Sequence, residues 1–191
     1  KKIAAEGNIM SLVDSSCTSK TIPSEGCFSM LFFKNAGLTT APELPAETLA
    51  ANCYNQMFNG CSSMTKAPVL PAAQLESRCY FGLFAKCTSL KYTPDLAAVV
   101  LADYCCAQMF YGCTSLEKAP VLPATTLSAY CYYGMFAGCK SLEAAPALPA
   151  TELPRSCYDC MFVSCSSLTE APDILATKVG YGSCFSMFDG C

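Results

Sequence analysis

The chain has 191 residues, of which 52% are hydrophobic and only 14% are charged, against roughly 25% charged in an average soluble domain. The net charge is −3 and the few lysines and arginines are scattered, so the sequence offers no basic stripe and nucleic acid is not an expected partner. The longest uninterrupted apolar run, residues 96–102, is far shorter than the roughly 20 residues that a membrane-spanning helix needs, so no membrane insertion is expected.

The two ends of the sequence depart from the pattern that lies between them. Residues 1–26 lack the phrases that recur later and are predicted to form an irregular first coil or cap, because terminal repeats of an array are normally atypical. No signal peptide is visible in the opening KKIAAEGNIM. The sequence stops at MFDGC, on a core position without a polar closing segment, so we expect the natural protein to continue past Cys191.

A repeat of constant length runs through residues 27–191. Its most regular marker is a Met-Phe or Leu-Phe pair, followed in several copies by Gly-Cys. A fixed period of this size is the signature of a solenoid, in which each unit buries its apolar face only against its neighbours, so one continuous array is predicted. The pairs begin 26 residues apart, at Leu31, Met57, Leu83, Met109, Met135, Met161 and Met187.

The first half of each repeat predicts a short strand. In TKAPVLPA, residues 65–72, each proline fixes its own φ and pushes the preceding residue into an extended conformation, so a helix cannot run through this stretch. Proline also lacks the N–H that a parallel ladder uses. We therefore expect a narrow parallel sheet with strands of about two to four residues, interrupted at the prolines.

The second half of each repeat predicts a short helix. Leu75, Cys79 and Leu83 are spaced i, i+4, i+8, which is an apolar stripe at helical period, and Gly60 and its equivalents follow where a C-terminal cap favours glycine. The predicted fold class is thus an α/β repeat with one strand and one helix per coil. Helices pack roughly 8–10 Å apart and strands about 4.8 Å apart, so the array should curve with its strands inside.

Two phrases, MFYGCTSLEKAPVLP and MFAGCKSLEAAPALP, resemble the A-F-x-G-C-x-S-L-x-x-I-x-I-P phrase of the BspA-like leucine-rich repeats of bacterial surface proteins. The resemblance covers residues 27–191 and implies a curved leucine-rich-repeat solenoid, secreted or at the cell surface, that serves adhesion or interaction. The sequence departs from the family in its longer period and in a column of cysteines where the family has a hydrophobic Ile column.

The sixteen cysteines fall mainly into two columns. Within one coil the two columns are eight residues apart, about 12 Å along a helix, which exceeds the roughly 7 Å limit for a disulfide. Because free cysteine packs as a small hydrophobe, we interpret both columns as buried, reduced core residues. The columns are Cys27, Cys53, Cys79, Cys105, Cys131 and Cys157, and Cys61, Cys87, Cys113, Cys139, Cys165 and Cys191.

Other roles for the cysteines stay open at this point. Cys160 and Cys184, on adjacent coils, are the best candidates for a disulfide, and the redox states of Cys17 and Cys106 are equally open. Metal binding is not expected, because the chain has no histidine and its one C-x-x-C pair, Cys157 with Cys160, lies inside a predicted helix. No cofactor is predicted.

An aromatic column follows the first cysteine column and has two interpretations. Each ring lies beside a buried helical position, which favours half-buried support with the hydroxyl at the surface. The alternative is an outward strip that stacks against sugar rings. Its candidate glycan-binding residues are Tyr54, Tyr80, Tyr132 and Tyr158.

Enzyme chemistry has little support in the sequence. Without histidine there is no Ser-His or Cys-His pair, and the acidic residues fall mainly at variable repeat positions. Catalytic clustering would break the repeat at one place, yet no copy between Cys53 and Ser167 carries an insertion. We therefore predict no enzymatic activity and no catalytic residues.

Chemical variation at two fixed positions beside the prolines predicts a binding surface. Solenoids bind partners over extended concave surfaces made from such columns. The leading hypothesis is a protein-binding or adhesion module with a host matrix or cell-surface protein as partner. The alternatives are a carbohydrate-binding module and a purely structural spacer. The candidate partner-binding residues are Lys66, Tyr92 and Lys118 from one column, and Val69, Asp95 and Val121 from the other.

Overall fold

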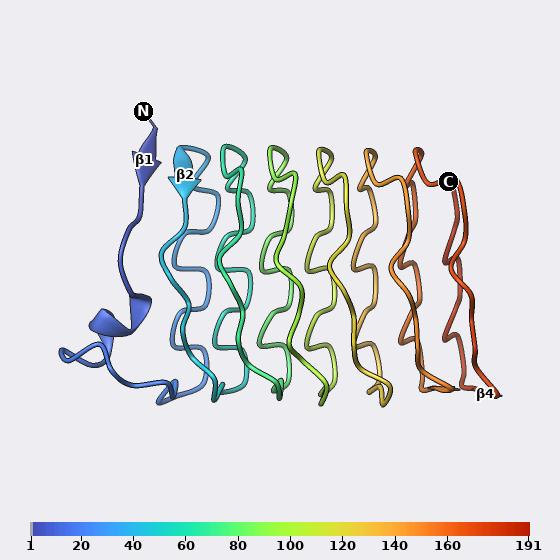
Figure 1. Cartoon of the computed structure of the whole chain (residues 1–191), viewed down its shortest axis with the longest axis horizontal. Coiled ribbons are helices and arrows are strands. Elements are labelled where there is room, and N and C mark those ends of the chain that lie inside the picture. The colour runs from blue at the N-terminus through green and yellow to red at the C-terminus, as the bar shows by residue number, and fades with distance from the viewer. Residues whose placement is uncertain (1) are drawn as a thin grey trace.

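The computed structural model describes residues 2–191, so Lys1, the first residue of the predicted cap, lies outside it. Figure 1 shows successive repeats side by side in a nearly straight row. Regular secondary structure is sparse. It consists of β1 (Ile3–Ala4), the 3-10 helix η1 (Ile9–Leu12), β2 (Leu38–Thr40), β3 (Glu152–Leu153) and β4 (Lys178–Val179).

One half of each repeat, the strand segment, pairs in parallel with its neighbours. β1 pairs with β2 and β3 pairs with β4, and between them isolated parallel bridges such as Lys66 with Tyr92 connect adjacent repeats. The prolines explain why these contacts are so short, because a proline cannot donate to the ladder. The strands that form are parallel and two or three residues long, as the prolines predict.

The other half, the turn ribbon, comprises residues 50–61 and the equivalent residues of each repeat. Its backbone amides alternate between two kinds of acceptor. The Met57 N–H donates to the Tyr54 carbonyl within the same repeat at 3.1 Å, whereas the Phe58 N–H donates to the Leu83 carbonyl of the next repeat at 3.0 Å. Every second amide of the ribbon thus binds the following repeat.

The predicted helix is not supported, because this half is a run of overlapping turns with a left-handed residue at every fourth position. In one ribbon these residues are Asn52, Gln56 and Gly60, with φ of 56°, 52° and 82°. An α-helix has negative φ throughout. Within residues 2–191 the only helix is η1.

The ribbon's burial pattern explains why its sequence resembles that of a helix. Two consecutive side chains point inward and the next two outward, so that Cys53 and Tyr54 are buried while Asn55 and Gln56 are partly exposed. This gives a period of four residues instead of the 3.6 residues of an α-helix. Over a stripe of nine residues the two periods place apolar residues at almost the same positions.

The physical basis of the predicted curvature is missing for a related reason. It rested on helices packing farther apart than strands, but strand segment and turn ribbon both stack through backbone hydrogen bonds between repeats. The two halves therefore advance by similar steps, and the row is nearly straight in the view of Figure 1.

The core between the two halves is built from side chains that stack on their own equivalents. The longest column is an unbroken stack of phenylalanine rings with centroids 5.5–5.7 Å apart. At the N-terminal side, Ile9, Met10 and Ile22 extend the buried core beside the first repeat. The stacked rings belong to Phe32, Phe58, Phe84, Phe110, Phe136, Phe162 and Phe188.

A glycine substitution pair distinguishes the turn ribbon from a helix. Gly134 has a φ of 56°, and a Cβ added there would lie 3.6 Å from Gln108 Cγ, an ordinary contact. Gly134→Ala should therefore destabilise the chain by about 1 kcal/mol through backbone strain alone. In a helix interior the same change would stabilise by about 1 kcal/mol. Urea unfolding measures the difference.

The reverse substitution is the matched control. Gln108 occupies the equivalent position one repeat earlier, with a φ of 54°. Gln108→Gly should leave the unfolding midpoint unchanged or raise it, because glycine adopts this φ without strain. A raised midpoint for Gly134→Ala together with a lowered one for Gln108→Gly would contradict the ribbon.

Candidate functional site

The predicted partner-binding residues all lie in strand segments, on consecutive repeats. We call Lys66, Val69, Tyr92, Asp95, Lys118 and Val121 the strand-face patch. All six residues are exposed, and Val69 and Tyr92, for example, are 67% and 58% exposed. The parallel bridge between Lys66 and Tyr92 sets these two residues side by side. The structure thus brings the sequence-predicted residues onto neighbouring positions of one surface.

The tyrosine of the patch is held in place by its neighbours. The Tyr92 hydroxyl donates to Glu117 Oε2 at 2.8 Å, and Lys91 Nζ forms an ion pair with Glu117 Oε1 at 2.9 Å. The hydrogen bond from Lys91 is the main reason that the pKa of Glu117 lies below its ordinary value. Sequence reasoning missed Lys91, because it lies outside the two columns beside the prolines. The pairing restricts the Tyr92 ring without covering it.

The other column of the patch combines an apolar and an acidic contribution. Asp95 Oδ1 accepts a hydrogen bond from the Val121 backbone N–H at 2.8 Å, which ties two adjacent repeats together. Val69 and Lys66 border a hollow of about 670 Å³ that also involves Pro42. This volume lies within the roughly 300–1,000 Å³ range of ligand pockets, but the hollow is open and apolar and suits a protruding side chain.

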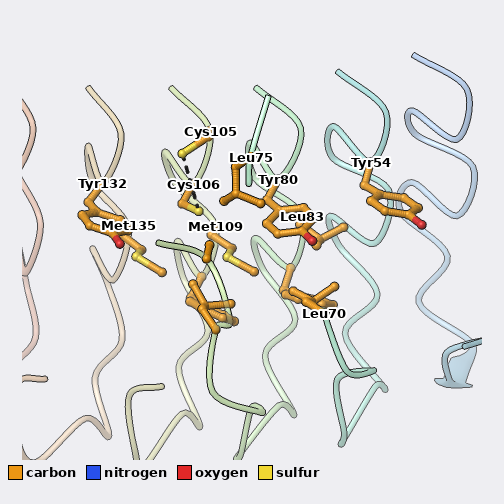
Figure 2. Close-up of a cluster of buried hydrophobic side chains, with 14 of the residues drawn as sticks. Tyr54, Leu70, Leu75, Tyr80, Leu83, Cys105, Cys106, Met109, Tyr132 and Met135 are labelled. Atoms are coloured by element: carbon orange, nitrogen blue, oxygen red, sulfur yellow. Dashed lines mark hydrogen bonds between the residues drawn. The ribbon is translucent and has the colours of Figure 1, made fainter. Parts of the chain in front are cut away.

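The candidate glycan-binding tyrosines are buried, which corrects the sequence-based alternative. Tyr54, Tyr80, Tyr132 and Tyr158 are each only 1% exposed. Figure 2 shows three of these rings inside the molecule, with Cys106 in the gap between Tyr80 and Tyr132. Rings in this position cannot stack against a sugar. The positive φ at every fourth residue turns this column inward, and a helical wheel cannot reveal that rotation.

The hydroxyl of Tyr54 is buried and has no hydrogen-bond partner within the described part of the chain. Its neighbours in the column stack on it with ring centroids 5.7 Å away for Phe28 and 6.2 Å away for Tyr80. Burial raises the pKa of Tyr80 well above its ordinary value. These phenols therefore behave as core residues that remain protonated.

The cysteine columns are buried, as predicted, except at the two ends of the array, where Cys27 is half-buried and Cys191 is exposed. In the second column each thiol also donates to a backbone carbonyl of the preceding repeat. Cys113 Sγ, for example, lies 3.0 Å from the Phe84 carbonyl oxygen. A thiol therefore serves here as a small apolar group with one donor, which alanine cannot supply.

The cysteines outside the columns have different environments. Cys106 is buried with its Sγ 3.9 Å from that of Cys105, Cys17 is exposed, and Cys160 and Cys184 are half-buried. All sixteen cysteines are free thiols, including the pair proposed for a disulfide. Among residues 2–191 no group of three or more His, Cys, Asp or Glu side chains is arranged to hold a metal ion.

The described residues contain no helix with the length and apolar character needed to cross a membrane.

Neither a protein-family model, nor a curated protein, nor a solved structure matches the chain.

The buried thiols predict loss of stability at alkaline pH. Burial raises the pKa of Cys113 to about 12, whereas an unfolded thiol has a pKa of about 8.5. Between these values the unfolded chain loses protons that the folded chain keeps, so each such thiol lowers the free energy of unfolding by about 1.4 kcal/mol per pH unit. Raised pKa values are found for Cys53, Cys61, Cys79, Cys87, Cys106, Cys113, Cys131, Cys139, Cys157 and Cys165.

Because a domain of this kind has only about 5–15 kcal/mol of stability, ionisation of these thiols in the unfolded chain should cause unfolding at about pH 10. Circular dichroism during an alkaline titration measures the transition. A variant with Cys113→Ala and Cys139→Ala removes two titrating groups and should show a shallower dependence on pH. A chain that stays folded to about pH 12 would contradict the assignment of these cysteines as buried free thiols.

Proposed function

We propose that the chain is a non-enzymatic protein-binding module, a solenoid of the BspA-like leucine-rich-repeat type from a secreted or surface-exposed bacterial protein. Its partner would be a protein, such as one of the host matrix or host cell surface. The strand-face patch carries the proposal. There, consecutive repeats hold exposed side chains of different chemistry on an otherwise repetitive scaffold.

The composition of the patch suits a protein partner. Tyrosine is enriched among residues that dominate binding energy, and Tyr92 stands between two lysine-bearing repeats. Val69 and Val121 add exposed apolar area, which gains free energy when it is covered. Because Glu117 already restrains Tyr92, binding would cost less side-chain entropy than it would for a free ring.

The chemistry of the interior supports a non-enzymatic role. The chain has no histidine, and burial raises the pKa of thiols such as Cys79 and Cys139 well above the ordinary value. A cysteine nucleophile acts as the thiolate and needs access to substrate. These thiols are protonated at neutral pH and enclosed in the core, so they fit a structural role.

A triple substitution tests the proposed surface. Lys66→Ala, Tyr92→Ala and Lys118→Ala together should weaken binding by roughly 2 kcal/mol or more, about thirtyfold, because they remove the aromatic and cationic anchors of the patch. The three residues are exposed, so the melting midpoint should hardly change. Surface plasmon resonance against purified collagen, fibronectin and laminin measures the affinity of the parent chain and of the variant.

The matched control changes the same residue types on the turn ribbon or directly after it. Lys86→Ala, Tyr111→Ala and Lys140→Ala remove two exposed lysines and one exposed tyrosine away from the patch. This control should bind like the parent chain. Equal losses in both triple variants would mean that general charge drives binding, and absence of binding to every matrix protein would favour the spacer.

A further inference from the structure

A second surface feature, separate from the strand-face patch, lies on the outer side of the later turn ribbons. It is a hollow of about 660 Å³ that we call the tyrosine cleft, and it falls within the roughly 300–1,000 Å³ range of ligand pockets. Sequence reasoning missed this cleft. The residues that border it and carry the argument are Tyr130, Tyr133, Asp159, Tyr181 and Phe185.

The cleft exists because one column of side chains changes size abruptly. At the first left-handed position of the ribbon, Tyr104 and Tyr130 stand in two successive repeats, and Ser156 and Gly182 occupy the next two. The rings of the two tyrosines stack with centroids 4.5 Å apart. Beyond Tyr130 the small residues leave a hollow beside the edge of its ring, while the guanidinium of Arg155 lies over the ring, 5.7 Å from its centroid.

Further aromatic rings enclose the cleft. Tyr133 meets Tyr130 edge to face, with a centroid distance of 6.2 Å and an angle of 66°. On the far side lie Tyr181 and Phe185 of the last repeat, which are 82% and 67% exposed. Exposed aromatic groups gathered around one hollow indicate a binding site for a ligand with an apolar face.

A carboxylate oxygen at the cleft lacks a hydrogen-bond donor. Asp159 Oδ1 is buried and has no partner within the part of the chain that the structure describes. Its repeat lies between those of Tyr133 and Phe185, as the hydrogen bonds from Gly134 N to the Asp159 carbonyl and from Cys160 N to the Phe185 carbonyl show. An unpaired buried acceptor is costly, and Asp159 borders the hollow, so a ligand hydroxyl that the carboxylate turns to meet would gain affinity.

A guanidinium group lies at the edge of the same cleft. Arg155 Cζ is 5.7 Å from the Tyr130 ring centroid and 5.8 Å from that of Tyr181, and Arg155 forms no salt bridge with any of residues 2–191. It can therefore donate hydrogen bonds to a ligand while it stacks on the two rings. The cleft thus combines aromatic faces, one free acceptor and one free donor group.

This combination selects a neutral, polyhydroxylated ligand. Arg155 disfavours a cationic ligand beside the rings it already covers, and Asp159 disfavours an anion. The C–H groups on one face of a pyranose ring carry partial positive charge and pack on the negative face of an aromatic ring. Its hydroxyls can donate to Asp159 and accept from Arg155. The Tyr133 hydroxyl, which is protonated at neutral pH, adds a further donor.

We propose that the tyrosine cleft binds a neutral pyranose sugar, with Tyr181 and Phe185 against its apolar face and Asp159 accepting one of its hydroxyls. This site is distinct from the buried tyrosine column and from the strand-face patch.

Saturation-transfer NMR with defined small molecules tests the proposal. The neutral probes are the methyl glycosides of glucose, galactose, mannose and N-acetylglucosamine, with methyl glucuronide as the anionic probe and tetramethylammonium as the cationic one. At least one neutral glycoside should bind the parent chain with a Kd of about 1 mM or lower. Both charged probes should bind more weakly, and stronger binding of either would overturn the assignment of ligand class.

Single substitutions locate the site. Asp159→Ala and Tyr181→Ala should each weaken binding of that glycoside about tenfold or more, because one removes the acceptor and the other an aromatic face. Tyr111→Ala, an exposed ribbon tyrosine outside the cleft, should keep the parent affinity. Unchanged melting midpoints show that the variants are folded, which is expected because Tyr181 and Tyr111 are exposed.

Three results would overturn the proposal. The first is no saturation transfer to any neutral glycoside. The second is binding that both cleft substitutions leave unchanged, and the third is an equal loss with Tyr111→Ala. The strand-face triple variant should retain full sugar affinity, so the outcome here is independent of whether the protein-binding proposal holds.

Discussion

The hydrogen bond from every second amide of the turn ribbon to the next repeat is the interaction on which the rest of the structure depends. For this bond to form, every second N–H group of a ribbon must point toward the next repeat. Overlapping turns with a left-handed residue at every fourth position give the backbone this orientation. The requirement explains why Gly60, Gly82 and Gly134 recur in the ribbons, since glycine adopts this backbone conformation without strain. It also fixes the step between repeats to a hydrogen-bonding distance.

That short step determines the chemistry of the core. Each side chain lies directly over its equivalent in the neighbouring repeat, so a residue type is useful if it packs well on itself. Phenylalanine rings stack face to face, as Phe58 and Phe84 do with centroids 5.7 Å apart and planes within 1°. Cysteine fits where space is smaller, and in the second column its thiol also binds a carbonyl, as Cys87 does with Phe58 at 3.2 Å. The sulfur content thus follows from packing.

Much of this architecture could be predicted from the sequence. The spacing of the Met-Phe pairs gives the period, prolines such as Pro68 and Pro71 restrict the strand segment to brief parallel contacts, and the cysteine columns are correctly assigned to the core. The turn ribbon could not be distinguished from a helix, because periods of four and of 3.6 residues nearly coincide over so short a stripe. Gly82 and Gly134, inside the predicted helix, were the available signal.

The candidate sites, like the fold, could be predicted from the sequence only in part. Residues beside the prolines, such as Lys66 and Tyr92, are exposed, and the change of residue type from repeat to repeat at these positions is the signal that predicts it. The tyrosines of the ribbon could not be assigned to a face in this way. Tyr54 is buried and Tyr181 is exposed, and only the sequence of turns decides which side each ring occupies.

The common direction of the ribbon hydrogen bonds also makes the row of repeats electrically polar. Phe84 N–H points to the Met109 carbonyl, and Phe110 N–H points to that of Met135, so these peptide dipoles are parallel and add. In an α-helix the N–H groups point towards the N-terminus, whereas here they point towards the later repeats. The row therefore carries a macrodipole of opposite sense to a helix, with its positive pole on the side of exposed Asp189 and its negative pole on the side of exposed Lys34.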